Sequence, residues 1–165
     1  MESRLNTIFE SRRYLIPFRT GLLPQIFCDT LVLGSGVAGL RSAIGAARNG
    51  QVIVCAKDEL NLTNTAWAQG GVAAVLPAGA QKQDDIRSHI RDTLTAGAGL
   101  CDEQAVHLVC EQGPSRINEI MDWGMRFDRD EQGHLRRGRE GGHSASRIFH
   151  AGGDTTGHEL QRTLT

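Results

Sequence analysis

The sequence lacks long hydrophobic runs, an excess of either charge and any paired-cysteine motif. Its apolar stretches stay shorter than the roughly 18–20 residues that a membrane-spanning helix needs, so we expect no membrane insertion. The net charge is −1 at pH 7, and acids and bases are interspersed, so nothing in the charge pattern indicates binding to nucleic acid. The four cysteines form no CxxC pair, which favours buried, reduced thiols and a cytoplasmic location.

Residues 1–27 lack the apolar core of a secretory signal peptide. They hold several arginines, but Glu2, Glu10 and Pro17 interrupt the pattern of an organelle transit peptide. We therefore predict an N-terminal extension over residues 1–27 that packs onto the rest of the protein. The remainder, with 39% apolar and 22% charged residues overall, has the composition of a soluble globular domain.

The clearest pattern that is present is a strand, a helix and a second strand. Residues 28–33 and 51–55 are short apolar runs of strand formers. The alanine-rich residues 40–47 between them have helical spacing and stop at Asn49-Gly50. Such a unit is the building block of an open parallel sheet. The sequence therefore predicts an α/β, Rossmann-like fold.

A glycine motif, Gly34-x-Gly36-x-x-Gly39, joins the first strand to the helix. The first glycine permits a tight turn, the second lets the backbone approach a pyrophosphate, and the third lets the helix pack closely on the strand. The amides and positive end of the helix attract phosphate. In this context the motif favours dinucleotide binding over a plain glycine turn.

Ala56-Lys57 follows the second strand, at the place where NAD-binding domains usually carry an acid that accepts hydrogen bonds from the adenosine ribose. A lysine cannot accept these bonds, so a standard NAD site is disfavoured. Lys57 suits phosphate or the adenosine half of a dinucleotide, and a solvated lysine at a strand end is the alternative.

Further helices are predicted from apolar periodicity and end signals, over residues 84–97, 102–113 and 114–124 and after residue 157. Pro114 is interpreted as starting a separate helix, because proline suits the first helical position. Residues 58–83 and 128–153 show no clear period and are expected to be loops. The buried stripe of the second helix is expected to comprise Ala105, Val106, Val109 and Cys110.

Four segments in order resemble the L-aspartate oxidases, members of the flavoprotein superfamily of succinate dehydrogenase and fumarate reductase. They are TNTAWAQGGVAAV (63–75), DTLTAGAGLCD (92–102), REGGHSASRIFHA (139–151) and GDTTG (153–157), and the likeness extends over residues 28–165. The resemblance implies that residues 28–165 form the amino-terminal part of an FAD-binding domain. The capping and C-terminal helical domains of that family would lie beyond this chain.

The resemblance also implies which residues hold the FAD. Asn64 stands where the membrane-bound dehydrogenases carry a histidine bonded to the flavin, so the FAD is expected to be non-covalent. Lys57 would lie by the adenosine half, and paired glycines would let backbone N–H groups approach the ring. The pyrophosphate would be held by Gly34, Ser35, Gly36, Val37, Ala38 and Gly39. The ribityl chain and ring would be lined by Asn64, Thr65, Ala66, Trp67, Ala68, Gln69, Gly70 and Gly71.

Glu140 is the residue that the resemblance implicates in substrate choice. The fumarate and succinate enzymes carry an apolar aromatic residue there, whereas a carboxylate can receive the ammonium of aspartate. His143 is the second candidate, through its place beside Glu140. Arg139 and Arg147 could attract a dicarboxylate, although solvated arginines are the default interpretation. Trp67 and Trp123 are interpreted as packing groups.

The histidines of the last third, His134, His143, His150 and His158, do not have the spacing of a zinc site, so no metal is expected. The resemblance implies oxidation of L-aspartate to iminoaspartate by flavin, with oxygen or fumarate as acceptor. This is the first step towards quinolinate and NAD, which suggests a functional link to quinolinate synthase. We expect the 165-residue chain alone to be inactive and to bind FAD weakly.

Two other functions remain open from the residues. One is a soluble fumarate reductase or succinate dehydrogenase-like flavoprotein, and the loss of the Glu140 carboxylate would distinguish it, because only aspartate turnover should suffer. The other is a non-catalytic nucleotide-binding module that senses or scaffolds. That alternative predicts a self-contained domain.

Overall fold

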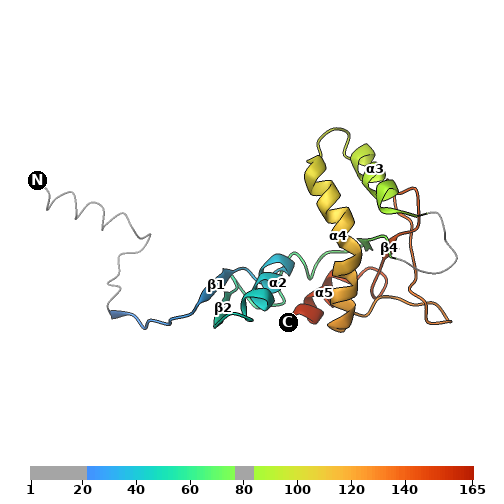
Figure 1. Ribbon diagram of the computed structural model, residues 1–165. Helices are drawn as coiled ribbons and strands as arrows, with labels where there is room; N and C mark the ends of the chain where they lie inside the picture. Colours follow the sequence, from blue (N-terminus) through green and yellow to red (C-terminus); the bar gives the residue numbers. More distant parts are fainter. Residues whose placement is uncertain (1–21, 77–83) are drawn as a thin grey trace, which may run out of the picture.

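The computed structural model describes residues 22–76 and 84–165, and its elements fall into two regions (Figure 1). The first region is a β–α–β unit, made of β1 (Thr30–Leu33), α2 (Val37–Ala46) and β2 (Val52–Cys55). The second contains α3 (Ile86–Ala96), α4 (Glu103–Asp122), β3 (Val72–Ala73) and β4 (Ile148–Phe149). Helix α5 (Thr156–Leu164) lies between the two regions and contacts α2.

The predicted β–α–β unit is confirmed. Strands β1 and β2 pair in parallel, from Thr30 opposite Val52 to Leu33 opposite Cys55. Helix α2 packs on both strands through the buried side chains of Leu40 and Ala43. It begins earlier than residue 40, because the glycine motif itself enters the helix.

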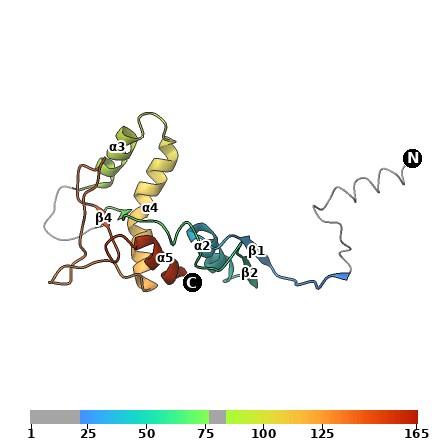
Figure 2. The ribbon, with the colours of Figure 1, turned by 180° about the vertical axis from the view of Figure 1, so that it is seen from behind.

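Both helices of the second region begin with an aspartate cap, as Asp102 was expected to provide for α4. The Asp102 carboxylate accepts a 3.0 Å hydrogen bond from the Ala105 amide, and the Asp85 carboxylate accepts one of 2.7 Å from the Ser88 amide. Each satisfies an amide that the first helical turn leaves unpaired. Seen from behind, α3 lies against the first half of α4 (Figure 2).

The prediction of two helices meeting at Pro114 is wrong. Helix α4 is continuous from Glu103 to Asp122 with Pro114 inside it. Proline lacks the N–H that would bond four residues back, a loss of about 3 kcal/mol. Burial of Cys110 and Ile117, on either side of the proline, holds the helix in place. The expected stripe is wrong at Ala105, which is exposed, and at Val109, which is 67% exposed, because the buried face runs from Cys110 to Ile117.

Each of the two predicted loops contains a short strand, and the two strands pair. Val72 lies opposite Phe149 and Ala73 opposite Ile148, in antiparallel register. Together with α4 they enclose the main hydrophobic core, which we call the β3–β4 core. Its buried members are Ala74, Leu76, Ile117, Met125, Phe127, Phe149 and Ala151.

Three sequence predictions concern the surface. Residues 1–21 lie outside the described residues, and Ile26 and Phe27, the end of the predicted extension, are 79% and 81% exposed, so the expected packing is not seen there. All four cysteines are free, but of the four Cys110 alone is buried as expected: Cys55 is exposed, and Cys28 and Cys101 are half-buried. No helix within the described ranges is long and apolar enough to cross a membrane.

Candidate functional site

The glycine motif has the geometry that its spacing predicts. Gly34 has φ of +107°, a conformation that other residues rarely adopt, and it ends β1. A Cβ at Gly39 would collide with the carbonyl oxygen of Gly34, so only glycine allows α2 to approach the strand this closely. The turn and the close packing are therefore both built by this sequence.

The N-terminus of α2 carries amides but no acidic group in its first turn. Gly36 is the N-cap and provides no side-chain bond, while the Val37 amide donates to Thr65 Oγ1 at 3.0 Å. The amides of Ala38 and Gly39 have no carbonyl one turn earlier within the helix. Among the amides predicted to bind the pyrophosphate, that of Val37 therefore already donates to Thr65. This bond holds the segment 64–71 against the N-terminus of α2.

Gln161 joins this site to α5, and sequence reasoning missed it. Its side chain is 2% exposed, and its Nε2 donates to the carbonyls of Ser35 at 3.0 Å and Leu60 at 2.8 Å. Its Oε1 accepts from the Thr63 hydroxyl at 2.9 Å. The only sequence signal is a glutamine on the buried face of a helix, which by itself does not indicate a partner.

Residues 64–71, the segment predicted to line the flavin, are also fixed by close backbone contacts. The Gly157 amide donates to the Ala68 carbonyl at 3.1 Å, and a Cβ at Gly157 would collide with Thr65 and Ala68. Gly70 has φ of +83° with open space where a Cβ would be. A Cβ at Gly71 would meet β4 and lie 2.9 Å from His150 Nε2, so packing on β4 is a second reason for glycine there.

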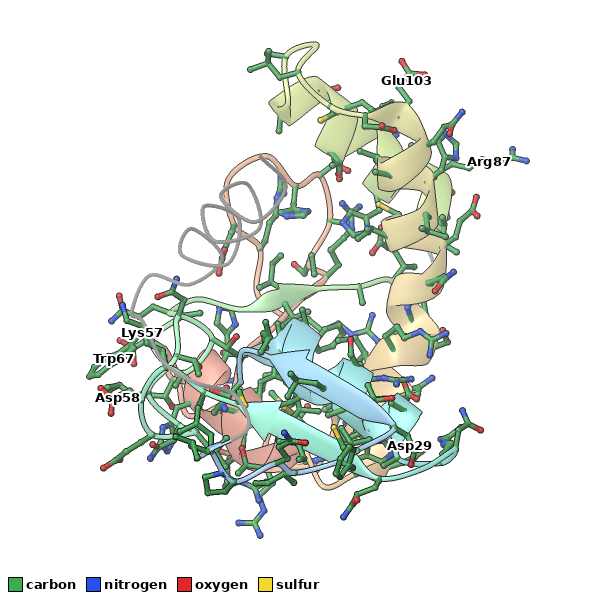
Figure 3. All side chains as sticks on the ribbon, turned by 90° about the vertical axis from the view of Figure 1, so that its left-hand side faces the viewer. Asp29, Lys57, Asp58, Trp67, Arg87 and Glu103 are labelled. Atoms are coloured by element: carbon green, nitrogen blue, oxygen red, sulfur yellow. The ribbon has the colours of Figure 1, made fainter. Side chains whose placement is uncertain are left out.

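The exposed residues of the predicted cofactor site gather at one edge. Figure 3 shows Lys57, Asp58 and Trp67 together, away from Asp29 at the opposite end of the sheet. Open α/β sheets bind nucleotides at the carboxyl ends of their strands, the end at which Lys57 lies. Trp67 is 74% exposed, so its interpretation as a packing group is wrong within this chain. Trp123 instead packs under the Arg41 guanidinium, 5.3 Å from the ring centroid.

The Glu140 side chain hydrogen-bonds His150 rather than the ring of its sequence neighbour His143. Glu140 Oε1 lies 2.8 Å from His150 Nε2. The pairing arises because Gly138 bridges Ile148 in antiparallel register, which brings the start of the loop beside the end of β4. His143 contacts Glu140 only through its amide, which donates to the Glu140 carbonyl at 3.3 Å.

Arg147 is fully buried, which corrects its interpretation as a solvated arginine. Its guanidinium donates to Asp84 at 2.6 Å and to Asp92 at 2.7 Å, and it contacts His143 Nδ1 at 3.2 Å. Asp92 also accepts two 2.7 Å bonds from the amide and hydroxyl of Ser144. Residues 139–147 are thereby anchored to α3. Arg139, in contrast, is exposed and donates to the His143 carbonyl at 3.0 Å.

These contacts shift the pKa values of Asp92 and His89, among others. Burial opposes the ionisation of Asp92, but the Ser144 bonds and Arg147 outweigh it and hold the Asp92 pKa well below its usual range. Burial lowers the pKa of His89, and the charge of Arg147 and the nearby His143 lower it further. The His89 and His143 ring centroids are 5.6 Å apart, and His89 Nδ1 is buried without a partner. Asp92 and His89 thus both belong to the set of α3 residues around Arg147 that fixes the loop 139–147.

Among the described residues, no group of three or more acidic, histidine or cysteine side chains is arranged to hold a metal ion. His134 and His158 are exposed, and His134 pairs with Asp130. At the edge of the predicted cofactor site, the described residues offer helix amides, glycine backbone and Lys57, a set of donors that fits a dinucleotide phosphate. The Glu140–His150 pair lies next to this set, across Gly71.

The FAD binding domain family matches residues 29–165 of the chain. L-Aspartate oxidase from Arabidopsis thaliana, described as chloroplastic, is 51% identical over 138 residues, which is 84% of this chain and 20% of that protein. L-Aspartate oxidase from Streptomyces coelicolor is 46% identical over 140 residues, or 84% of this chain and 23% of that protein. The chain therefore spans about a fifth to a quarter of these relatives' length.

Solved structures share the fold. Sdh1 of Mycobacterium smegmatis in complex with UQ1 superposes with a TM-score of 0.78 at 34% identity, over 86% of this chain and 24% of that one. A quinol fumarate reductase of E. coli gives a TM-score of 0.76 at 32% identity, with the same two coverages. The predicted flavoprotein fold and the predicted likeness to L-aspartate oxidases are confirmed.

Proposed function

Since the chain belongs to the FAD binding domain family, we propose that it contributes the FAD site and part of the substrate site of an L-aspartate oxidase. The observation that supports this most is the carboxylate of Glu140, held beside the glycine segment 70–71 by a loop anchored at both ends. Relatives named L-aspartate oxidase, at 46–51% identity, add independent support.

The proposed reaction converts L-aspartate to iminoaspartate. FAD, when bound, supplies the acceptor for the hydride that leaves Cα, and the ammonium loses a proton. The two electrons pass to oxygen, which yields peroxide, or to fumarate, which yields succinate. A further enzyme must consume the labile imine, and quinolinate synthase in a route to NAD is the candidate partner.

The chain's own residues would bind and orient. The N-terminus of α2, with Ser35, Gly36 and Ala38, would hold the pyrophosphate, and Lys57 would lie by the adenosine half. Asn64 has an amide that forms no covalent link to flavin, so the cofactor would be bound without one. Trp67 and the neighbouring residues 64–71 would line the flavin ring. We expect the enzyme to act in the cytoplasm.

Glu140 would receive the substrate ammonium and so favour an amino acid over a dicarboxylate without an amino group. An ionised acceptor paired with an ammonium is a strong hydrogen bond. Its position is exposed enough for a ligand, with the side chain 51% accessible. His143 would act indirectly, by contacting Arg147 in the anchor of the loop.

The experiment measures peroxide release from L-aspartate by the product of the complete open reading frame, with succinate and D-aspartate as controls. We expect peroxide with L-aspartate alone. Glu140→Gln should lower kcat/KM for L-aspartate by about 10- to 100-fold, because a charged hydrogen bond is worth roughly 1.5–3 kcal/mol. Glu131→Gln, at an exposed glutamate of the same glycine-rich stretch, is the matched control.

A yellow protein that ignores L-aspartate but reduces fumarate would instead support a dehydrogenase-like flavoprotein, the class of the similar solved structures. A protein that binds nucleotide without any turnover would support the non-catalytic module. For the 165-residue chain alone, we expect no turnover and weak FAD binding, measurable by the quenching of flavin fluorescence.

A further inference from the structure

We propose that His150 is the positioning residue that orients the Glu140 carboxylate towards the substrate ammonium. This inference rests on the function proposed above and identifies a second residue behind its substrate selectivity. Its basis is the 2.8 Å contact between His150 Nε2 and Glu140 Oε1, which joins residues ten positions apart in the sequence.

The first step of the argument is that Glu140 needs an external restraint. Its side chain is 51% exposed and lies in a glycine-rich turn, and an exposed glutamate samples several rotamers. Ordering such a side chain on binding costs roughly 0.5–1.5 kcal/mol, which a bound ligand has to offset. A partner that fixes the carboxylate in advance removes this cost.

The second step is that His150 is itself well fixed. Its side chain is 26% exposed, and its carbonyl accepts a 2.8 Å bond from the Asp128 amide directly after β4. Its ring lies against two glycines: a Cβ at Gly138 would approach Cε1 to 3.0 Å, and a Cβ at Gly71 would approach Nε2 to 2.9 Å. The ring therefore fills a space that the backbone leaves open.

The third step is the division of the carboxylate oxygens. One oxygen, Oε1, is engaged by His150, and the structure gives Oε2 no bond to another described residue. A carboxylate has about four acceptor positions, so a bond to His150 leaves several for an ammonium. His150 and the substrate thus bind the same group from different sides.

The fourth step is location. Gly71 belongs to the segment assigned to the flavin ring, and His150 lies directly against it. The Glu140–His150 pair consequently lies where residues 64–71, the segment assigned to the flavin, meet the loop 139–147. His143, the histidine closer in sequence, faces the Arg147 anchor and cannot take this role.

The experiment compares steady-state oxidation of L-aspartate by the complete open-reading-frame product and its His150→Ala and His150→Gln variants. For His150→Ala we expect KM for L-aspartate to rise about 10-fold with kcat changed by less than about twofold, because one hydrogen bond to a charged group is lost. His150→Gln keeps an N–H donor and should restore KM to within about threefold of the wild type.

Two readouts separate positioning from a merely structural role. The affinity for succinate, measured from the perturbation of the flavin spectrum, should be unchanged in His150→Ala, because succinate has no ammonium. In a Glu140→Gln background, His150→Ala should cause no further rise in KM, because its target carboxylate is gone. His134→Ala, at an exposed histidine, is the matched control.

The outcomes are distinguishable from failure of the proposed function. If the wild type does not oxidise L-aspartate, both proposals fall. If it does, an unchanged KM in His150→Ala overturns the positioning role alone, as does an equal KM rise in the Glu140→Gln background. Should His150→Ala fold poorly, His150→Gln paired with His150→Leu decides, since only the donor-bearing side chain is expected to retain the wild-type KM.

Discussion

The β–α–β unit and the β3–β4 core are stabilised in different ways. In the β–α–β unit, the strand residues Leu31 and Leu33 are 55% and 77% exposed, and parallel backbone pairing and α2 provide most of the order. In the β3–β4 core, Phe149 and Ala151 are 0% and 1% exposed. The region with the most recognisable motif is therefore the one with less buried apolar surface.

The comparison teaches that this chain fixes its predicted substrate loop and its predicted cofactor turn by different means. The loop 139–147 leads into β4, and its buried Arg147 anchors it to Asp84 and to Asp92 of α3. The cofactor turn relies on glycine geometry and on Gln161. Four experiments test this difference.

The largest effect is expected for Arg147→Ala. It would leave Asp84 and Asp92 as unpaired carboxylates that are 7% and 12% exposed. Removing one partner of a buried ion pair costs about 3–5 kcal/mol of unfolding free energy. Urea denaturation followed by circular dichroism measures it. Arg116→Ala, an exposed helix pair with Glu119, should cost less than about 1 kcal/mol, and equal losses would contradict the buried anchor.

Gln161→Ala should have the next largest effect, because Gln161 connects α5 to the β–α–β unit and to the segment that follows it. It would leave the carbonyls of Ser35 and Leu60 and the hydroxyl of Thr63 without this partner. Each unsatisfied buried group costs about 1–3 kcal/mol where water cannot replace the bond. We expect a loss of unfolding free energy together with weaker FAD binding. Gln104→Ala, exposed on α4, should change neither quantity.

Gly39→Ala and Gly45→Ala form a matched pair within α2. The first would drive a methyl group into the Gly34 carbonyl and separate the helix from β1, at a cost of about 1–3 kcal/mol. The second places its methyl group 3.4 Å from a flexible Arg41 nitrogen and should stabilise α2 by about 0.5–1 kcal/mol. Thermal unfolding measures both, and shifts of the same sign would refute the close approach at Gly39.

The smallest effect concerns pH at the loop anchor. The pKa of His89 is lowered from its ordinary 6.5, so the unfolded chain binds a proton there at a higher pH than the folded chain. The contribution of His89 to the free energy of unfolding is therefore fully present above about pH 6.5 and is lost as the pH falls below that value. Asp92 does not contribute in this window, because its stabilising ionisation is lost only below its ordinary pKa of 3.8.

The measurement compares urea midpoints at about pH 7.5 and pH 5.5 in wild type and His89→Gln. The decrease in the midpoint should be smaller in the variant, because the buried imidazole is gone. His134→Gln, at an exposed site, should behave as the wild type. A wild-type midpoint that is equal at both pH values would argue against the lowered pKa.

Local patterns predicted the parts of the fold that local chemistry determines. The β–α–β unit, the Asp102 cap and the helix around Ile86 and Ile90 all follow from spacing within one turn or strand. Pro114 was misinterpreted because its usual position at a helix start is a preference, and tertiary burial of Cys110 and Ile117 overrode it. Strands of two residues, such as β3 and β4, are too short to show a period.

The site was predictable where one residue is sufficient and not where partners are distant. Glu140 was identified from its motif, but its partner His150 follows from the Gly138–Ile148 bridge, which no local pattern indicates. Arg147 looked like a solvated arginine because its partners Asp84 and Asp92 lie over fifty residues earlier. Long-range pairing decided both cases.

The spacing of Gly157 and Gln161 on α5 restricts how this helix can change in length. The two residues stand at i and i+4, so they share a face, and that face contacts Ala68 through Gly157 and Ser35 through Gln161. Inserting a single residue between them would rotate one relative to the other by about 100° and break one set of contacts. Substitutions on the outer face of α5 are compatible with this geometry, but insertions and deletions within the helix are not.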